Sequence, residues 1–298
     1  MLVLLSVAVC RTAGAELETR GFAVVRAGGG VASDLFLGAG QAATGTASLA
    51  PSLELDLSLA PAVKVFTDGE ADIERYFGSG GDAATGDGEL LVQLRPLSWL
   101  YPELYGSAQG AWYHDVLGPP DPNLPYEAAV SRSQLFSGGA ALRAYFDTTE
   151  ARAILIAGER VSTGTTRYIE QPVSAQISAA TPLGKDARVA AFYRFTDNVS
   201  EALGYAYTSH ELTGNILWSP LEGLALRAWA GFRVNHTGLD ELDRFPHWAL
   251  TAAYHLWGPM WLEATGSAEL EWSHNPDGVS TLYTAYGGIR AEGGPWRE

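Results

Sequence analysis

Apolar and polar residues alternate one for one along much of this 298-residue chain. In residues 52–59 every odd position is leucine and every even position is Ser, Glu or Asp. Residues 224–236 and 261–273 alternate in the same way. Because successive side chains of a β-strand point to opposite faces, this period predicts strands with one apolar and one polar face. No stretch shows a convincing helical period, so we expect an all-β fold.

The alternating segments are longer than the strands of soluble sheets, which usually have five or six residues. Eleven residues at a rise of about 3.3 Å and a tilt of about 40° climb roughly 28 Å, enough for the apolar band of a membrane barrel. Residues 150–161 are apolar on both faces, so their sides are not assigned. We expect about fourteen strands, with a range of twelve to sixteen, at 19–32, 48–60, 62–76, 88–97, 102–114, 131–146, 150–161, 171–181, 186–196, 206–218, 223–236, 246–257, 260–273 and 280–292.

The connections between these segments alternate in length. Short turns are expected at 60–62, 96–101, 147–149, 182–185, 219–222 and 257–259. Longer Gly-, Pro- or polar-rich loops are expected at 33–47, 77–87, 115–130, 162–170, 197–205, 237–245 and 274–279. Short turns on one rim and long loops on the other are typical of outer-membrane barrels, with both termini on the short-turn side.

Aromatic residues gather near both rims, as expected where amphipathic rings lie at membrane interfaces. Those beside the short turns are Trp99, Tyr101, Tyr145, Phe146, Trp218, Trp257 and Trp261. Those near the long loops are Trp112, Tyr113, Phe195, Phe245, Trp248 and Trp272. The competing interpretation is a soluble sheet sandwich whose edges are capped by aromatic rings.

Over residues 16–298 the chain therefore resembles the Gram-negative outer-membrane β-barrel class, which includes the porins. The resemblance implies a transmembrane up-and-down antiparallel β-barrel in the cell outer membrane, with short periplasmic turns and longer extracellular loops. It also implies contact with outer-membrane lipid and lipopolysaccharide, and insertion by the barrel-assembly machinery. Such barrels commonly end on an aromatic residue, whereas here Gly293-Gly294-Pro295 is expected to interrupt the last strand before Trp296-Arg297-Glu298.

A second, local resemblance concerns residues 28–36, Gly-Gly-Gly-Val-Ala-Ser-Asp-Leu-Phe. They are similar to a stretch that ends the first strand in barrels associated with polysaccharide export, although the aromatic residue and the Asn of that stretch are absent. The match implies periplasmic polymer-export proteins as partners.

Residues 1–15 are interpreted as a signal peptide preceding a barrel domain over 16–298. Leu2–Cys10 is apolar, and Ala13-Gly14-Ala15 fits a cleavage site. A lipoprotein attached through Cys10 and a buried first strand are the alternatives. One cysteine excludes a disulfide framework or a cysteine metal site, and a net charge of −15 argues against nucleic acid as a partner.

If the apolar faces meet lipid, mid-strand charges must point inward, because an outward Arg or Lys at mid-depth costs about 2–4 kcal/mol. The acids expected inside are Glu54, Asp56, Glu89, Glu103, Glu263, Glu269 and Glu271. The cations expected inside are Arg143, Arg188, Arg194, Arg227 and Arg233. Closure would place the acids on one wall and the arginines on the other. The two sets either create a field across a narrow pore or cross-link a plugged interior.

The sequence predicts no catalytic residue, no cofactor and no metal. His247 and His255 share one face but lie eight residues apart, roughly 26 Å in a strand, too far to share a metal. Ser209 and His210 are adjacent and so lie on opposite faces. The preferred function is a passive, porin-like channel for small polar or charged solutes. The alternatives are a conduit for exopolysaccharide secretion, a structural or adhesive barrel, and an outer-membrane hydrolase.

Overall fold

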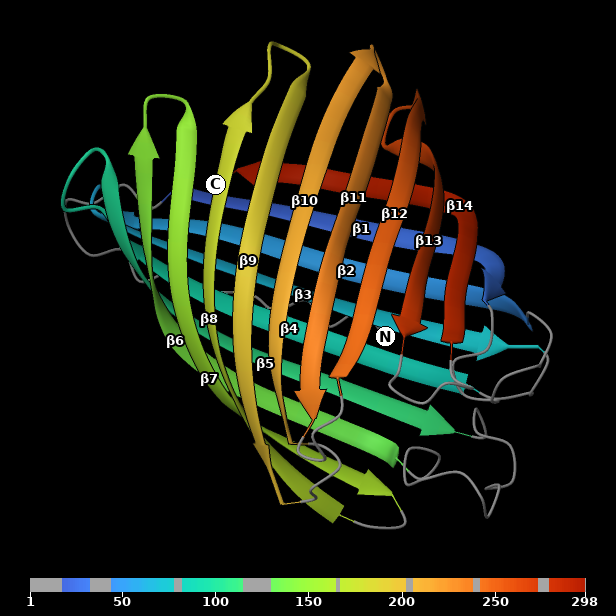
Figure 1. Cartoon of the computed structure of the whole chain (residues 1–298). Helices are drawn as coiled ribbons and strands as arrows, with labels where there is room; N and C mark the ends of the chain where they lie inside the picture. The colour runs from blue at the N-terminus through green and yellow to red at the C-terminus, as the bar shows by residue number, and fades with distance from the viewer. Residues whose placement is uncertain are drawn as a thin grey trace.

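The computed structural model describes residues 18–32, 44–77, 82–114, 130–164, 167–201, 206–237, 242–272 and 279–297 (Figure 1). The predicted signal peptide, residues 1–15, lies outside these ranges. Within them there is no helix long and apolar enough to cross a membrane. The strands are β1 (Glu18–Ala32), β2 (Thr44–Ala60), β3 (Val63–Tyr76), β4 (Asp82–Leu94), β5 (Leu100–His114), β6 (Val130–Phe146), β7 (Thr149–Gly164), β8 (Arg167–Pro182), β9 (Ala187–Ser200), β10 (Tyr207–Leu221), β11 (Leu224–Thr237), β12 (Leu242–Trp257), β13 (Met260–Trp272) and β14 (Val279–Arg297).

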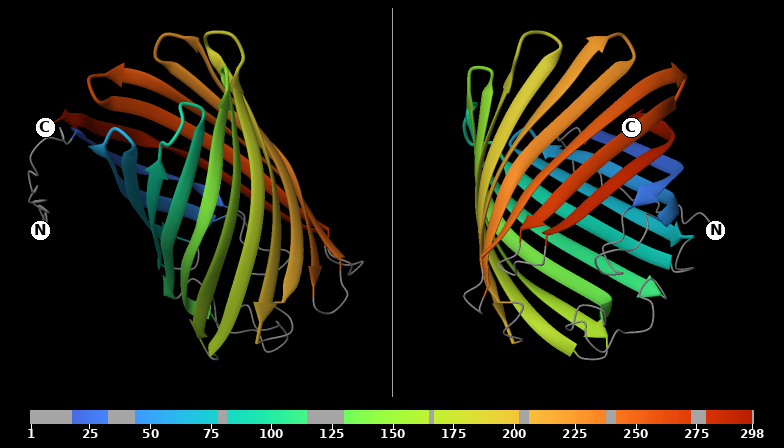
Figure 2. Two further views of the ribbon diagram at one scale, coloured as in Figure 1. Left: turned by 90° about the vertical axis from the view of Figure 1, so that its left-hand side faces the viewer. Right: turned by 45° about the vertical axis from the view of Figure 1, so that its right-hand side comes forward.

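The sheet closes on itself. Strand β1 pairs with β2 on one side and with β14 on the other, and each remaining pair joins strands that follow one another in the chain. Every pairing is antiparallel. The strands form the wall, run obliquely to the barrel axis and surround one interior (Figure 2). The prediction of an up-and-down antiparallel barrel with fourteen strands is confirmed.

The short turns overlap their predicted positions, except that β10 continues through Leu221 and shifts the turn predicted at 219–222 toward β11. The intervals between strands on this rim are 61–62, 95–99, 147–148, 183–186, 222–223 and 258–259. Asp147 and Gly223 have φ angles of 57° and 76°. This left-handed region costs glycine nothing and costs Asp less than most residues, so both residues suit tight reversals.

Several strands extend further than expected, mostly at the long-loop rim. The predicted loops at 77–87 and 162–170 are wrong in extent, because β4 begins at Asp82 and β7 and β8 together leave only 165–166 between them. At the other rim, β14 continues to Arg297 past Gly293, with a register shift opposite Gly21 and Ala23. At a rim the outward face leaves the hydrocarbon region, so polar residues there hide the alternation on which strand prediction depends.

The barrel is apolar outside and polar where it is buried. Leu155, Ile177 and Leu250 are 58%, 61% and 53% exposed and all face outward. The buried side chains include many polar ones: Gln93, Glu103, Ser162, Glu170, Asn198, Ser209, Thr213 and His247. This inverts the arrangement of a soluble protein, and it fits a barrel surrounded by lipid.

The segment 150–161, whose sides the sequence left open, has a definite orientation. Ile154 is 7% exposed and points inward, whereas its neighbour Leu155 points outward. Arg152 and Arg160 therefore also belong to the inner face.

The aromatic belts are formed by only part of the predicted sets. The outward-facing members are exposed at both rims: Trp99, Phe146, Trp218 and Trp257 by the short turns, and Trp112 and Trp248 toward the long loops. Four predicted members point inward instead: Tyr101, Tyr145, Phe245 and Trp261. Tyr101 and Tyr145 pack edge to face, while Phe245 and Trp261 lie under arginines.

Glycines make the seam where the first and last strands meet. Gly28 lies opposite Gly288, and Gly30 lies opposite Tyr286. A Cβ at Gly28 or Gly288 would strike the Tyr286 ring, so the missing side chains leave the space that this ring occupies. Packing thus explains Gly28, and also Gly30, where a Cβ would meet the Ala285 carbonyl oxygen. Residues 33–36 of the local resemblance lie outside the described residues.

Candidate functional site

The inner face of the barrel brings the predicted charged residues together. Directly opposed residues of neighbouring strands point to the same face of a sheet, so this face can be followed around the barrel by register. One such row runs through Ser58, Lys64, Gln93, Glu103, Ala141, Ile154, Gln176, Arg194, Glu211, Arg233 and Phe245.

By the same register, further predicted residues lie on the inner face: Arg143, Arg188 and Arg227, and the acids Glu54, Asp56, Glu89, Glu263 and Glu269. Glu271 lies opposite Ser280 in the register, and its side chain is outside the described set. The role of all the predicted charged residues in lining a pore remains a prediction.

Glu103 is the centre of the strongest charge cluster. Its side chain is fully buried and lies between two arginines, with Arg143 Nε 2.8 Å from one carboxylate oxygen and Arg152 Nε 2.8 Å from the other. Gln93 also donates to Glu103, with an Nε2–Oε1 distance of 2.9 Å. Charge-assisted bonds to both oxygens satisfy this carboxylate and tie β4, β5, β6 and β7 together.

Three further predicted arginines lie beside carboxylates of other strands. Arg188 Nη2 is 3.1 Å from Glu150, and Arg194 Nη1 is 3.9 Å from Glu211. Arg233 Nη2 is 3.3 Å from Glu269, and its guanidinium lies over the Phe245 ring. Much of the predicted arginine charge is therefore compensated locally.

Arg227 differs from the other predicted arginines. Its side chain is exposed to the interior, and within the described ranges it makes no ion pair and no hydrogen bond. Its register partners are Leu217 and Thr251, which supply no charge. Arg227 therefore presents an uncompensated positive charge to the interior.

Carboxylates dominate the opposite side of the barrel. Glu54, Asp68 and Glu89 are direct register partners on three successive strands, and Glu70 faces Asp87 one step further. The cations close to this group include Arg26, whose Nη1 is 3.0 Å from Glu70, and Lys64, whose Nζ is 3.8 Å from Asp56; Arg20 is the register partner of Asp56. Like charges on adjacent strands repel one another, so this surface favours a nearby cation.

The two sides carry opposite excess charge. We call the inner face of β2–β4 the acidic sector: its described side chains are Glu54, Asp56, Asp68, Glu70, Asp72, Glu74, Asp87 and Glu89, with one cation, Lys64. We call the inner face of β6–β11 the basic sector: its described side chains are Arg143, Arg152, Arg160, Arg188, Arg194, Arg227 and Arg233, with the acids Glu150, Glu170 and Glu211.

The sectors face one another across the interior. Strands β3–β4 and β10–β11 are seven places apart around the ring, and Figure 1 shows β10 and β11 crossing in front of β1–β4. The expectation that each wall carries a single sign of charge is wrong, because Glu103 belongs to an arginine cluster and Arg290 pairs with Glu263. What remains is an opposite excess, centred on Asp68 and Glu89 on one side and on Arg227 on the other.

A Thr–His–Glu cluster lies within the wall. Thr213 Oγ1 is 3.3 Å from both His247 Nε2 and Glu211 Oε1. The other ring nitrogen of His247 faces the Phe245 carbonyl oxygen at 3.1 Å. Thr213 and His247 are only 5% and 7% exposed and are packed over Gly231, and among the described residues the partner of Nδ1 is this backbone carbonyl and not a carboxylate. The cluster fills the wall and lacks the access that a nucleophile requires.

Sequence reasoning missed about half of the charged inner face. Asp87 was placed in a loop, and Arg152 and Arg160 lie in the segment without assigned sides. Asp68, Asp72 and Glu74 were not among the acids expected inside, although strict alternation with Thr67, Ala71 and Ile73 marks them as inward. Within the described ranges, no group of three or more His, Cys, Asp or Glu residues is arranged to hold a metal ion.

Comparison with known proteins identifies the fold. No family model matches the sequence, and no curated protein sequence matches it. The trimer form of OmpT, an outer membrane protein of Vibrio cholerae, matches with a TM-score of 0.54 and 8% identity, over 93% of this chain and 99% of that one. A deletion mutant of the TodX monoaromatic hydrocarbon channel matches with a TM-score of 0.54 and 9% identity, over 95% and 91%. The outer membrane channel DcaP of Acinetobacter baumannii matches with a TM-score of 0.53 and 10% identity, over 95% of this chain and 99% of that one.

The fold and the inner face together define an outer-membrane β-barrel. Apolar side chains face outward, aromatic rings lie near both rims, and the charged side chains lie inside. The predicted class and its location in the cell outer membrane are confirmed by this architecture and by the shared fold.

Proposed function

We propose that this barrel is a passive channel through which small polar or charged solutes cross the outer membrane. The observation that carries the proposal is the opposition of the acidic and basic sectors, with Arg227 uncompensated in the basic sector. Charges of opposite sign on facing walls create a transverse field, which orients dipolar solutes in a narrow passage.

The dimensions of the barrel support a narrow passage. Fourteen strands at a spacing of about 4.8 Å and a tilt of about 40° give a backbone radius of roughly 14 Å. All the described strands belong to the wall, so none of them occupies the interior. Carboxylates outnumber cations in the acidic sector by more than arginines outnumber acids in the basic sector. We therefore expect cations to pass more readily than anions.

Planar-bilayer recording tests this proposal. Wild-type protein is expected to give discrete conductance steps with a preference for cations. Arg227→Gln, alone or with Arg233→Gln, removes positive charge from the basic sector and should increase that preference. The matched control is Lys185→Gln, which removes a positive charge from a periplasmic turn and should leave selectivity unchanged. A silent membrane, or equal reversal potentials for wild type and the Arg227 variants, contradicts the proposal.

A further inference from the structure

Charged side chains on the outer surface are confined to one rim. Among the side chains that the structure describes in the strands, every outward-facing Asp, Glu, Lys, Arg or His lies within five residues of the long-loop end of its strand. They are Arg75, Asp82, Arg132, Glu159, Arg167, Asp197, His210, His236 and Arg244. An outward arginine costs about 2–4 kcal/mol at the bilayer centre but only about 0–1 kcal/mol near the interface, so this rim lies at headgroup depth.

Three of these residues form a cationic patch on consecutive strands. His210, Val234 and Arg244 are successive register partners on β10, β11 and β12, and His236 lies two residues beyond Val234 on the same face. Two strand spacings of about 4.8 Å separate His210 from Arg244 by roughly 10 Å. His210, His236 and Arg244 are exposed, and within the described ranges Arg244 has no protein partner. We call these three residues the outer cationic patch.

The His210 ring is held in place by two aromatic residues of the neighbouring strand β9. The Tyr193 hydroxyl lies 2.7 Å from His210 Nδ1, and the Phe195 ring centroid lies 5.2 Å from the His210 ring centroid. When the hydroxyl donates to Nδ1, the hydrogen is on Nε2, which can then donate to an anionic oxygen. A lipid-facing His fixed in this way is prepared to bind an acceptor at the membrane surface.

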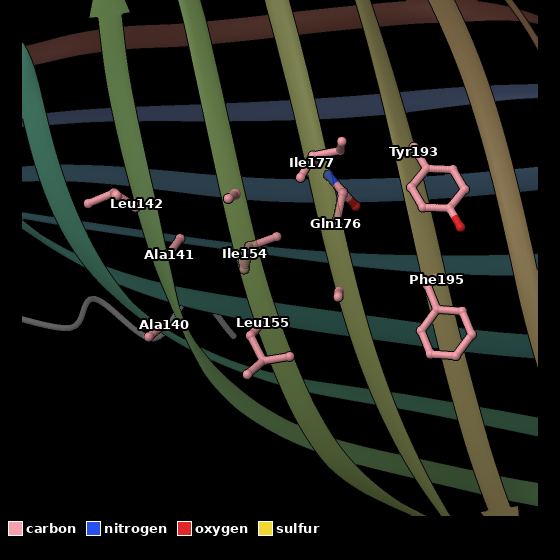
Figure 3. Close-up of a pocket in the computed structure, with 11 residues that line it drawn as sticks. Ala140, Ala141, Leu142, Ile154, Leu155, Gln176, Ile177, Tyr193 and Phe195 are labelled. Carbon is pink, nitrogen blue, oxygen red and sulfur yellow. The ribbon is translucent and has the colours of Figure 1, made fainter.

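An apolar hollow lies on the same outer surface beside Tyr193 and Phe195. It has a volume of about 510 Å³ and crosses β6–β9 (Figure 3). Small outward residues form its floor: Ala140, Ala153 and Ala175. Leu142, Leu155 and Ile177 form its ridges, and Tyr193 and Phe195 connect it to His210. Its apolar lining suits hydrocarbon, and it lies below the rim that carries the patch.

We propose that the outer cationic patch binds the phosphates of one lipopolysaccharide molecule, with an acyl chain of its lipid A lying in the alanine-floored hollow. The outer leaflet meets the long-loop rim, where lipid phosphates supply the negative charge that Arg244 lacks. Arginine binds phosphate oxygens through paired N–H donors, and the two His side chains add further donors. A second copy of the chain is a poor occupant, because contact between two such patches would bring their Arg244 charges together.

Lipid titration of the purified barrel in detergent, read by native mass spectrometry, tests the proposal. The probes are diphosphoryl lipid A, monophosphoryl lipid A and phosphatidylglycerol. Wild type is expected to bind one diphosphoryl lipid A, and to bind the other two lipids more weakly. Because hydrogen bonds to charged groups are strong, Arg244→Gln with His236→Gln should weaken this binding about tenfold or more. Arg244→Lys should retain part of it.

Matched variants separate this site from the channel. Arg233→Gln removes an arginine from the inner face of β11 and should leave lipid A binding unchanged. Ala175→Phe fills the hollow and should weaken binding, whereas Ala264→Phe, on the outer face of β13, should not. The Arg244→Gln and His236→Gln changes should leave conductance unchanged, so the lipid site and the channel can fail independently.

Three results overturn the proposal. One is wild-type affinity for diphosphoryl lipid A in the Arg244→Gln, His236→Gln variant, with folding verified by circular dichroism. A second is equal affinity of wild type for phosphatidylglycerol and diphosphoryl lipid A. A third is a dimer that forms in wild type and is lost in Ala175→Phe, because a second copy would then occupy the hollow.

Discussion

Glu103 and Arg152 bond across an intervening strand. The Arg152 Nε atom donates to Glu103 Oε2 at 2.8 Å, although Glu103 is on β5 and Arg152 is on β7. Arg143 of β6 lies between them and contacts the other oxygen of the same carboxylate. Three neighbouring strands are thus joined by one buried charge as well as by their backbone ladders.

Loss of the Glu103 charge should destabilise the barrel. In Glu103→Gln, Arg143 and Arg152 remain mostly buried, at 21% and 23% side-chain exposure, without their shared carboxylate. Removing one partner of a buried ion pair is costly, so the free energy of unfolding should fall by about 3 kcal/mol. Urea titration of protein folded into lipid vesicles measures this free energy of unfolding. The control is Glu54→Gln, which changes an exposed acid and should cost almost nothing.

Neutralising the acidic sector should shift selectivity in the opposite direction to neutralising Arg227. Asp68→Asn with Glu89→Gln removes two adjacent negative charges from facing positions of β3 and β4. The preference for cations should then fall, and the reversal potential in a salt gradient should move toward that of an anion-preferring channel. The effect should shrink at high salt, because the Debye length falls to about 3 Å at 1 M. A reversal potential that does not move contradicts the role of this sector.

The seam between β1 and β14 should be sensitive to a single methyl group. In Gly28→Ala, the new Cβ meets the Tyr286 hydroxyl and the Gly287 carbonyl oxygen, so the ring or the backbone must shift. Overpacking of this kind typically costs about 1–3 kcal/mol. The control is Gly110→Ala, where no atom lies within 4 Å of the new Cβ. The temperature at which heating changes the gel mobility of the folded barrel should be lower for Gly28→Ala than for wild type, and unchanged for Gly110→Ala.

Two consecutive residues of β13 test which face meets lipid. Ala264 points outward and Thr265 points inward, where it pairs with Thr251 through hydroxyl groups 3.0 Å apart. Ala264→Arg should lower the free energy of unfolding in vesicles by about 2–4 kcal/mol, since arginine would then face hydrocarbon near mid-depth. Thr265→Arg should cost far less, because its charge faces the interior near Glu263. Equal losses in the two variants would contradict the assignment of the faces.

The sequence predicted the fold well because every strand of a membrane barrel has one face toward lipid and the other toward the interior. Leu53 and Leu250 must be apolar wherever lipid surrounds them, so alternation revealed both the strands and their sides. Strand ends were predicted less well, as at Asp82 and Arg297. Polar residues are allowed on both faces there, and a period of two disappears although the ladder continues.

The inner face was predicted only in outline. The register placed Arg143 and Glu103 inside, but nothing in the sequence shows that they share one cluster, because they lie on different strands and pair through side chains. Likewise, nothing local distinguishes Arg227, which lacks a partner, from Arg233, which is beside Glu269. Such pairings depend on how far the strands slide past one another, and this is fixed only when the ring closes.

The pairing of β1 with β14 has a consequence for how the protein is made. Among the described strands, every ladder except β1–β14 joins two strands that follow one another in the chain. These ladders can therefore form one hairpin at a time. The remaining ladder joins the first and the last of these strands, and until both are present two open edges stay available to other chains. A chain whose sheet is incomplete must therefore be kept apart from its neighbours until its final hairpin has formed.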